Sequence, residues 1–149
     1  MKEVTILLST YNGEKYLEEQ LESITSQKGV STKIIVRDDG SSDRTCDILD
    51  TWKEKSALTW YRGENIGPAQ SFMDLLRNAG DACYYAFSDQ DDFWLSDKMQ
   101  TAVSKLESYD GRPALYFCQT ELVDKYRALS RLGLPAAFGL FEEHASPAG

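Results

Sequence analysis

The order of apolar and amphipathic segments along the chain constrains the fold more than any other feature. Four short segments are rich in β-branched, aromatic and other apolar side chains, as expected of strands that are buried on both faces: residues 4–8, 33–36, 58–61 and 83–87. The stretches between them carry apolar residues at helical spacing, such as Leu17, Leu21 and Ile24. This alternation predicts an α/β domain with a doubly wound, mainly parallel sheet and helices on both faces.

Two further elements are predicted towards the end of the chain. Residues 96–108 carry Met99, Val103 and Leu106 at the spacing of one inward helix face, and residues 114–118 resemble a fifth strand. With 149 residues, the chain has room for one domain with a substantial core.

Charge and composition exclude several functional classes. A net charge of -8 argues against nucleic-acid binding, which requires a basic surface. Three cysteines without a CxxC spacing predict free thiols in a reducing compartment. No apolar run is long enough for a membrane span, and the predicted first strand begins too early to leave room for a signal peptide. These features predict a cytoplasmic protein.

Polar or glycine-containing segments follow each of the first four predicted strands: Ser9–Asn12, Asp38–Ser41, Asn65–Gly67 and Asp89–Asp92. The carboxyl ends of parallel strands lie at one edge of the sheet, where doubly wound proteins bind their ligands. The sequence therefore predicts that the four segments meet in one site.

The most acidic of these segments follows an apolar strand directly. Asp89, Asp91 and Asp92 provide carboxylate oxygens, which Mg²⁺ and Mn²⁺ prefer as ligands. An acidic loop can also simply stabilise the N-terminus of the helix that follows it, and the segment alone does not decide between these roles. Phe93 and Trp94 behind it are predicted to be core or helix-staple residues rather than ligand contacts.

The other segments also have structural alternatives. Asp38 or Ser41 could cap the following helix, and Gly40 is expected to permit the turn. The residues from Asn65 onwards read equally well as a turn. Tyr11 could pack at the edge of the sheet, or its ring could stack on a nucleobase whose N–H groups donate to a nearby aspartate. The chain has neither a P-loop motif nor a GxGxxG motif.

Taken together and in order, these four segments resemble the N-terminal half of the family 2 glycosyltransferases, whose GT-A fold binds nucleotide sugars. The resemblance covers about residues 3–125, and its first and last motifs are most similar to the rhamnosyltransferase-like branch. It predicts a GT-A domain over residues 1–126, truncated at the C-terminus, and an atypical, partly disordered tail over residues 127–149.

The resemblance implies a site for a UDP- or dTDP-sugar and for Mn²⁺ or Mg²⁺. Asp91 and Asp89 would form a DxD motif that binds the metal, and Asp39 is favoured over Asp38 as acceptor of the pyrimidine N3–H. The residues implied to bind the nucleotide sugar are Ser9, Thr10, Tyr11, Asp38, Asp39, Asn65, Gly67, Asp89 and Asp92. The implied reaction is inverting transfer to a saccharide or lipid-linked acceptor in polysaccharide or cell-surface glycan biosynthesis.

The catalytic base stays unassigned. In the family it lies further from the DxD motif than this chain extends, and Glu121 and Asp124 follow the motif too closely to match. We therefore expect a chain that binds nucleotide and metal but transfers sugar poorly.

Two other functions remain as alternatives. One is a noncatalytic nucleotide-binding module of the same fold, and the other is a receiver-like signalling domain, whose acidic residues would follow other strands. An exposed sheet edge would allow a homodimer, and membrane association would be at most peripheral, at the inner face.

Overall fold

A computed structural model describes residues 1–109 and 111–123 of the chain. The chain divides into two compact units, Met1–Val103 and Ser104–Gly149. The first unit contains all four strands of the sheet that the described residues form. The predicted boundary at residues 126 and 127, and the tail behind it, lie outside the described residues and stay predictions.

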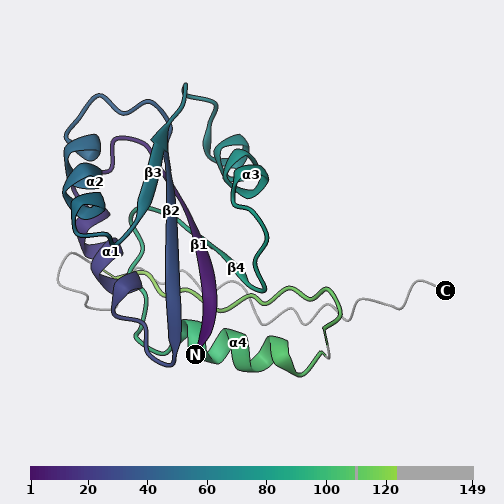
Figure 1. The fold of residues 1–149 in the computed structure, drawn as a ribbon. Helices are drawn as coiled ribbons and strands as arrows, with labels where there is room; N and C mark the ends of the chain where they lie inside the picture. The colour runs from purple at the N-terminus through teal and green to yellow at the C-terminus, as the bar shows by residue number, and fades with distance from the viewer. Residues whose placement is uncertain (110, 124–149) are drawn as a thin grey trace. The chain divides into compact units, whose positions relative to one another are not determined.

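The sheet of the first unit has four parallel strands in the order β3-β2-β1-β4 (Figure 1). The strands are β1 (Lys2–Thr10), β2 (Val30–Asp38), β3 (Thr59–Arg62) and β4 (Tyr85–Ser88). The chain proceeds outward from β1 to β3 and then returns to the other side of β1. The strand order therefore reverses between β1 and β4, and all four carboxyl ends lie at one edge, which confirms the predicted doubly wound, parallel α/β class.

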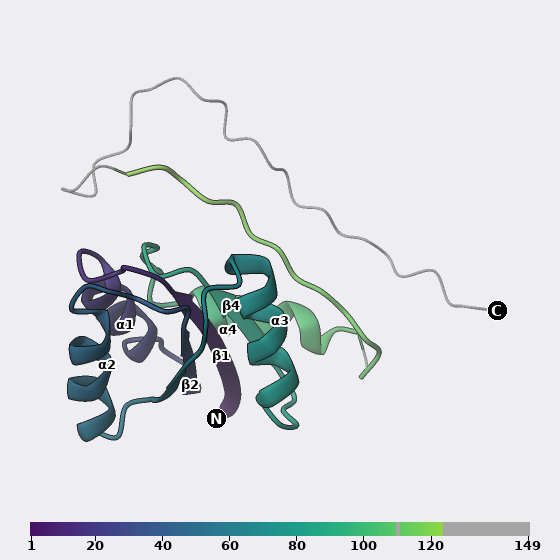
Figure 2. The same ribbon diagram turned by 90° about the horizontal axis from the view of Figure 1, so that it is seen from above.

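Helices connect and follow the strands: α1 (Leu17–Thr25), α2 (Thr45–Glu54), α3 (Pro68–Asn78) and α4 (Lys98–Glu107). In Figure 2, α1 and α2 lie on one face of the sheet and α3 on the other. Among the described residues, no helix is long and apolar enough to span a membrane.

Alternate residues of β1 face two separate apolar clusters. Ile6 and Leu8 pack in the larger cluster, which includes residues of α1, α2 and α4, whereas Leu7 packs with Leu75 of α3 in the smaller one. All four side chains are fully buried. Since burial of such a side chain contributes about 1.5–3 kcal/mol, the central strand anchors both helical layers.

One predicted element is corrected by the structure. Residues 114–118 form no strand, and the side chains of Leu115 and Phe117 are 70% and 55% exposed. An apolar, β-rich segment becomes a strand only when it pairs with another, and the described sheet ends at β4. Of the two aromatic residues predicted to be core or helix-staple residues, Trp94 is a core residue, whereas Phe93 is 40% exposed and lies outside the core.

Candidate functional site

A cavity of about 400 Å³ lies where the loops after all four strands meet. We call it the rim cavity. Its lining residues are Ser9, Tyr11, Asp39, Asn65, Gly67, Pro68, Asp89, Gln90 and Asp91. The structure thus brings together residues from the four segments that the sequence predicts to form one site.

Three of the predicted site residues do not line the rim cavity. Thr10 is buried and donates its hydroxyl to Gln90, at 2.5 Å. Asp38 is buried in a separate network, and Asp92 lies beyond Asp91 outside the lining. Any contact of these three residues with a ligand stays a prediction.

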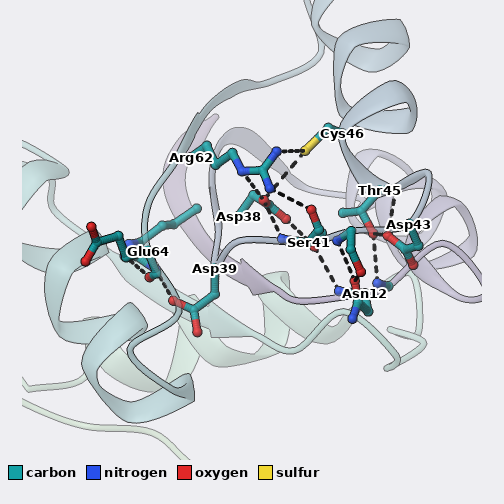
Figure 3. A network of polar contacts seen from close by, with 12 residues as sticks. Asn12, Asp38, Asp39, Ser41, Asp43, Thr45, Cys46, Arg62 and Glu64 are labelled. Atoms are coloured by element: carbon teal, nitrogen blue, oxygen red, sulfur yellow. Dashed lines mark hydrogen bonds and ion pairs between the residues drawn. The ribbon is translucent and has the colours of Figure 1, made fainter.

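Asp38 holds the loop after β2 in place. Its carboxylate accepts the backbone N–H of Ser41 at 3.0 Å and also the Ser41 hydroxyl. The guanidinium of Arg62 lies 3.7 Å away, and the thiol of Cys46 donates to the same carboxylate at 3.6 Å (Figure 3). Gly40 has a φ of 87°, which confirms the predicted role of glycine in this turn. Asp38 therefore shapes the site from within the protein.

The environment of Asp38 also affects Cys46. Burial, followed by the negative charge of Asp38 and the hydrogen bond to it, raises the pKa of the Cys46 thiol. A raised pKa keeps the thiol protonated and able to donate. Cys46 is therefore a structural rather than a reactive cysteine.

Asp39 points to the opposite side of the chain from Asp38 (Figure 3). Its two carboxylate oxygens accept the backbone N–H groups of Ile66 and Gly67, each at 3.0 Å. Arg37 pairs with the same carboxylate. Asp39 is only 3% exposed but lines the rim cavity, so it is a rigidly held acceptor at the wall of the site.

Arg37 extends this network to α3. Its Nε donates to Asp74 at 3.1 Å, and its Nη2 donates to the carbonyl of Glu64 at 3.0 Å. Its Nη1 also lies 3.3 Å from the hydroxyl of Ser71, which in turn accepts from Ser9 at 2.6 Å. One buried guanidinium therefore connects β2, the loop after β3 and the first turns of α3.

The loop after β1 is fixed by the loop after β2. The side-chain oxygen of Asn12 accepts the backbone N–H of Ser42 at 2.8 Å, and the Asn12 N–H donates to the Ser41 hydroxyl at 2.8 Å. The Gly13 N–H donates to the Thr45 hydroxyl at 2.8 Å. Tyr11, a residue that is 46% exposed, is therefore presented from a well-supported backbone.

Asp43 supports α2 and the loop after β1 together. Its carboxylate accepts the Thr45 N–H at 3.0 Å and the Glu14 N–H at 3.2 Å. Burial raises the pKa of Asp43, but its hydrogen bonds from Thr45 and Glu14 together outweigh burial and lower it. The N-cap residue of α2 is Arg44, and Asp43 before it, rather than Asp38 or Ser41, supplies the carboxylate that accepts the first backbone N–H of the helix.

The acidic loop, residues 89–92, concentrates negative charge beside the cavity. Burial and then the charge of Asp91 raise the pKa of Asp89. Burial, followed by the charges of Asp89 and Asp91, raises the pKa of Asp92. Carboxylates that repel one another in this way are stabilised by a bound cation.

The carboxylates of the acidic loop fit a hard divalent cation whose remaining ligands would come from a bound molecule and from water. Asp89 and Asp91 both line the cavity and supply oxygen ligands. Within residues 1–109 and 111–123, no three His, Cys, Asp or Glu side chains converge on one metal position. Mg²⁺ or Mn²⁺ held by one or two carboxylates would complete its coordination with diphosphate oxygens and water.

Two important residues were not predicted from the sequence. The sequence does carry a signal for Arg37, because this residue directly follows the apolar run Ile34–Val36, and a cation that is buried beside such a run must be paired. No local sequence signal points to Gln90, since its hydrogen-bond partners Thr10 and Tyr11 lie 80 and 79 positions away in the chain.

Comparison with known proteins identifies the family. The sequence model of Glycosyl transferase family 2 matches residues 5–132. The chain belongs to family 2 of the glycosyltransferases. This confirms the resemblance drawn from the four sequence segments.

Individual family members support the same assignment. The chain is 32% identical to the dTDP-rhamnosyl transferase RfbG of Shigella flexneri over 94% of its own length and 51% of that protein. It thus spans about half of the length of this curated relative. The similarity agrees with the predicted rhamnosyltransferase-like branch.

Solved glycosyltransferase structures share the GT-A fold with this chain. S. aureus TarS 1-349 in complex with UDP-GlcNAc gives a TM-score of 0.64 at 26% identity, over 74% of this chain and 32% of that one. The mannosyltransferase PcManGT from Pyrobaculum calidifontis, in complex with GDP-Man and Mn²⁺, gives 0.63 at 29% identity, over 69% and 32%. These similarities confirm the predicted GT-A fold.

Proposed function

We propose that this chain forms the donor-binding domain of an inverting glycosyltransferase that binds a nucleoside-diphosphate sugar together with Mn²⁺ or Mg²⁺. The observation that carries the proposal is the rim cavity, which places Tyr11 and Asp39 in the same lining as Asp89 and Asp91. An aromatic ring beside a hydrogen-bond acceptor suits the pyrimidine base of a nucleotide, and a pair of carboxylates suits a metal ion that is bound to the diphosphate.

The pyrimidine base of the nucleotide would bind between Tyr11 and Asp39. Each carboxylate oxygen has two lone pairs, so Asp39 can accept a pyrimidine N3–H in addition to its contacts with Arg37, Ile66 and Gly67. The half-exposed ring of Tyr11 offers a stacking surface. The fixed acceptor would orient the base without reorganisation when it binds.

The diphosphate would bind beside the acidic loop. Asp91, with Asp89 as its partner, would hold the cation, and Asp92 would help to position the donor sugar. Once bound, such a cation stabilises the negative charge that develops on the leaving nucleoside diphosphate. The Mn²⁺ in the structurally similar mannosyltransferase PcManGT supports this part of the proposal.

The donor would be a dTDP- or UDP-sugar, in line with the dTDP-rhamnosyl transferase and UDP-GlcNAc-bound proteins to which the chain is similar. The acceptor would be a saccharide or a lipid-linked glycan, used at the cytoplasmic side of the membrane in polysaccharide biosynthesis. None of the described residues is assigned as the catalytic base.

Calorimetric titration of UDP and dTDP, with and without Mn²⁺, tests the proposal. We expect Mn²⁺ to strengthen nucleotide binding and Asp91→Asn to remove that effect, since even outer-shell partners of a metal change its affinity by about 10–100-fold. Asp81→Asn, an exposed aspartate outside the cavity lining, is the matched control and should bind as the unmodified chain does. Binding that responds neither to Mn²⁺ nor to Asp91→Asn would refute the metal-dependent donor site.

The competing noncatalytic module of the same fold need not retain metal-dependent affinity. Nucleotide binding that Mn²⁺ does not strengthen would therefore favour that module. Turnover does not separate the two readings when it is slow, because this chain is expected to transfer sugar poorly, whereas acceptor-dependent release of nucleoside diphosphate would exclude the noncatalytic module.

A further inference from the structure

Gln90 lies between the two carboxylates of the proposed metal site, but its side chain contacts the loop after β1. Its Oε1 accepts the Tyr11 N–H at 2.8 Å and the Thr10 hydroxyl at 2.5 Å. Its Nε2 donates to the Tyr11 carbonyl at 3.0 Å. The side-chain amide therefore pairs with both backbone polar groups of Tyr11, much as a neighbouring strand would.

This contact extends the link between β1 and β4 beyond the sheet. The last paired residues of these strands are Leu8 and Ser88, so the ladder stops two positions before Gln90. The two loops meet where the strand order reverses, the position at which doubly wound sheets bind ligands. Among the described side chains that line the rim cavity, Gln90 directly joins the acidic loop to the loop that carries Tyr11.

The backbone of Gly13 leaves the space that the Gln90 amide occupies. A Cβ added at Gly13 would lie 2.3 Å from Oε1 of Gln90 and 2.7 Å from the Thr10 hydroxyl. Both distances are far below van der Waals contact, so any larger residue at position 13 would displace the amide. The sequence thus combines a glutamine on one loop with a glycine on the other.

We infer that Gln90 is a positioning residue that couples the two halves of the donor site. It fixes the backbone of Tyr11 on the nucleobase side, and, because Gln90 lies between Asp89 and Asp91, the same side-chain contacts anchor the loop that carries the metal-side carboxylates. This inference rests on the proposed function, because it assigns the base and the metal diphosphate to the same cavity. Its consequence is that metal and nucleotide reinforce each other's binding through Gln90.

The test uses Gln90→Met, which keeps the length of the side chain and removes its hydrogen bonds. Gln100→Met is the matched control. Gln100 is exposed and also packs over a glycine, since a Cβ added at Gly29 would lie 2.5 Å from the Gln100 side chain. Unlike Gln90, it does not line the rim cavity. We expect Gln90→Met to reduce the enhancement of UDP binding by Mn²⁺ by about tenfold or more. Gln100→Met should leave the enhancement unchanged, and both variants should unfold at similar temperatures.

Amide hydrogen exchange provides a readout that does not depend on nucleotide binding. Without ligand, Gln90→Met should accelerate exchange of the Tyr11 amide, whose acceptor is lost, and Gly13→Ala should do the same from the other loop. Unchanged exchange at Tyr11, or faster exchange together with an unchanged Mn²⁺ effect on UDP binding, would overturn the positioning role. If the unmodified chain shows no Mn²⁺-dependent nucleotide binding, the proposed function fails, and the exchange rates at Tyr11 alone decide whether Gln90 holds that loop.

Discussion

Arg37 and Asp39 form an almost completely buried ion pair, with side chains that are 5% and 4% exposed. The two residues are two positions apart at the end of β2, and their pair connects the sheet to the loop that carries Gly67. A buried pair of this kind determines geometry because neither charge can be satisfied by water.

We predict that Arg37→Met destabilises the fold by about 3–5 kcal/mol, because it leaves the carboxylate of Asp39 buried without its cation. Arg77→Met is the control: Arg77 is an exposed residue in the last turn of α3, so its loss should cost about 1 kcal/mol or less. Urea unfolding measures both variants. Equal free energies of unfolding for the two would show that the buried pair does not support the loop.

The second prediction concerns Asp43, which accepts the first backbone N–H of α2 and the backbone N–H of Glu14. Asp43→Ala should lower the free energy of unfolding at pH 7 by about 1 kcal/mol, and Asp43→Asn by less, because the amide oxygen of asparagine can accept the same N–H groups. The pKa of Asp43 is lowered in the folded protein, so its charged form contributes stability above its ordinary value of 3.8. That contribution is lost as the pH falls through the lowered pKa.

Urea unfolding at pH 7 and pH 3 therefore separates the two effects. Asp43→Asn should lose less stability than the unmodified chain between these pH values. An identical loss in both would contradict the assigned role of the Asp43 charge.

The third prediction concerns Tyr61. Burial and then the hydrogen bond to Asp74, at 2.7 Å, raise the pKa of the Tyr61 phenol to about 12. Since the folded-state pKa exceeds the ordinary value of 10, the protonated phenol stabilises the fold below pH 10, and this contribution is lost as the pH rises towards 12. The difference between the ultraviolet titrations of the unmodified chain and Tyr61→Phe should show one phenol that ionises near pH 12. A difference titration centred near pH 10 would contradict the contact with Asp74.

The fourth prediction uses neighbouring leucines of α3. Leu75 is fully buried beneath the helix, whereas Leu76 is 37% exposed. Leu75→Ala should therefore cost about 2–5 kcal/mol because it leaves a cavity, and Leu76→Ala should cost clearly less. Thermal or urea unfolding compares the two directly, and similar losses would indicate that α3 packs on the sheet in a different orientation.

Local patterns explain which parts of this structure could be predicted from the sequence. Strand β1 and helix α1 follow from the spacing of their own apolar residues, and the meeting of the four loops follows from the parallel order of the strands. The strand predicted at residues 114–118 was wrong because strand formation depends on a pairing partner, which the segment itself does not specify.

The polar contacts within the site depend on tertiary structure and were largely hidden. Asp38 and Asp39 are adjacent in the sequence, but one is enclosed by Ser41 and Arg62 while the other reaches the rim cavity. A pair of aspartates after a strand predicts a site without showing which carboxylate faces it. The contact between Gln90 and Tyr11 spans 79 positions and becomes visible only when β1 and β4 are placed side by side.

Paramagnetic broadening by Mn²⁺ in nuclear magnetic resonance spectra tests the central claim most directly, because it locates the metal on the protein. With UDP or dTDP present, we predict that Mn²⁺ broadens the amide resonances of Tyr11, Gly67, Asp89 and Asp91. The resonances of Glu54 and Val30, at the opposite ends of α2 and β2 from the rim cavity, should stay sharp. Broadening that is absent at the acidic loop, or centred elsewhere, would contradict a metal-dependent nucleotide site in this cavity.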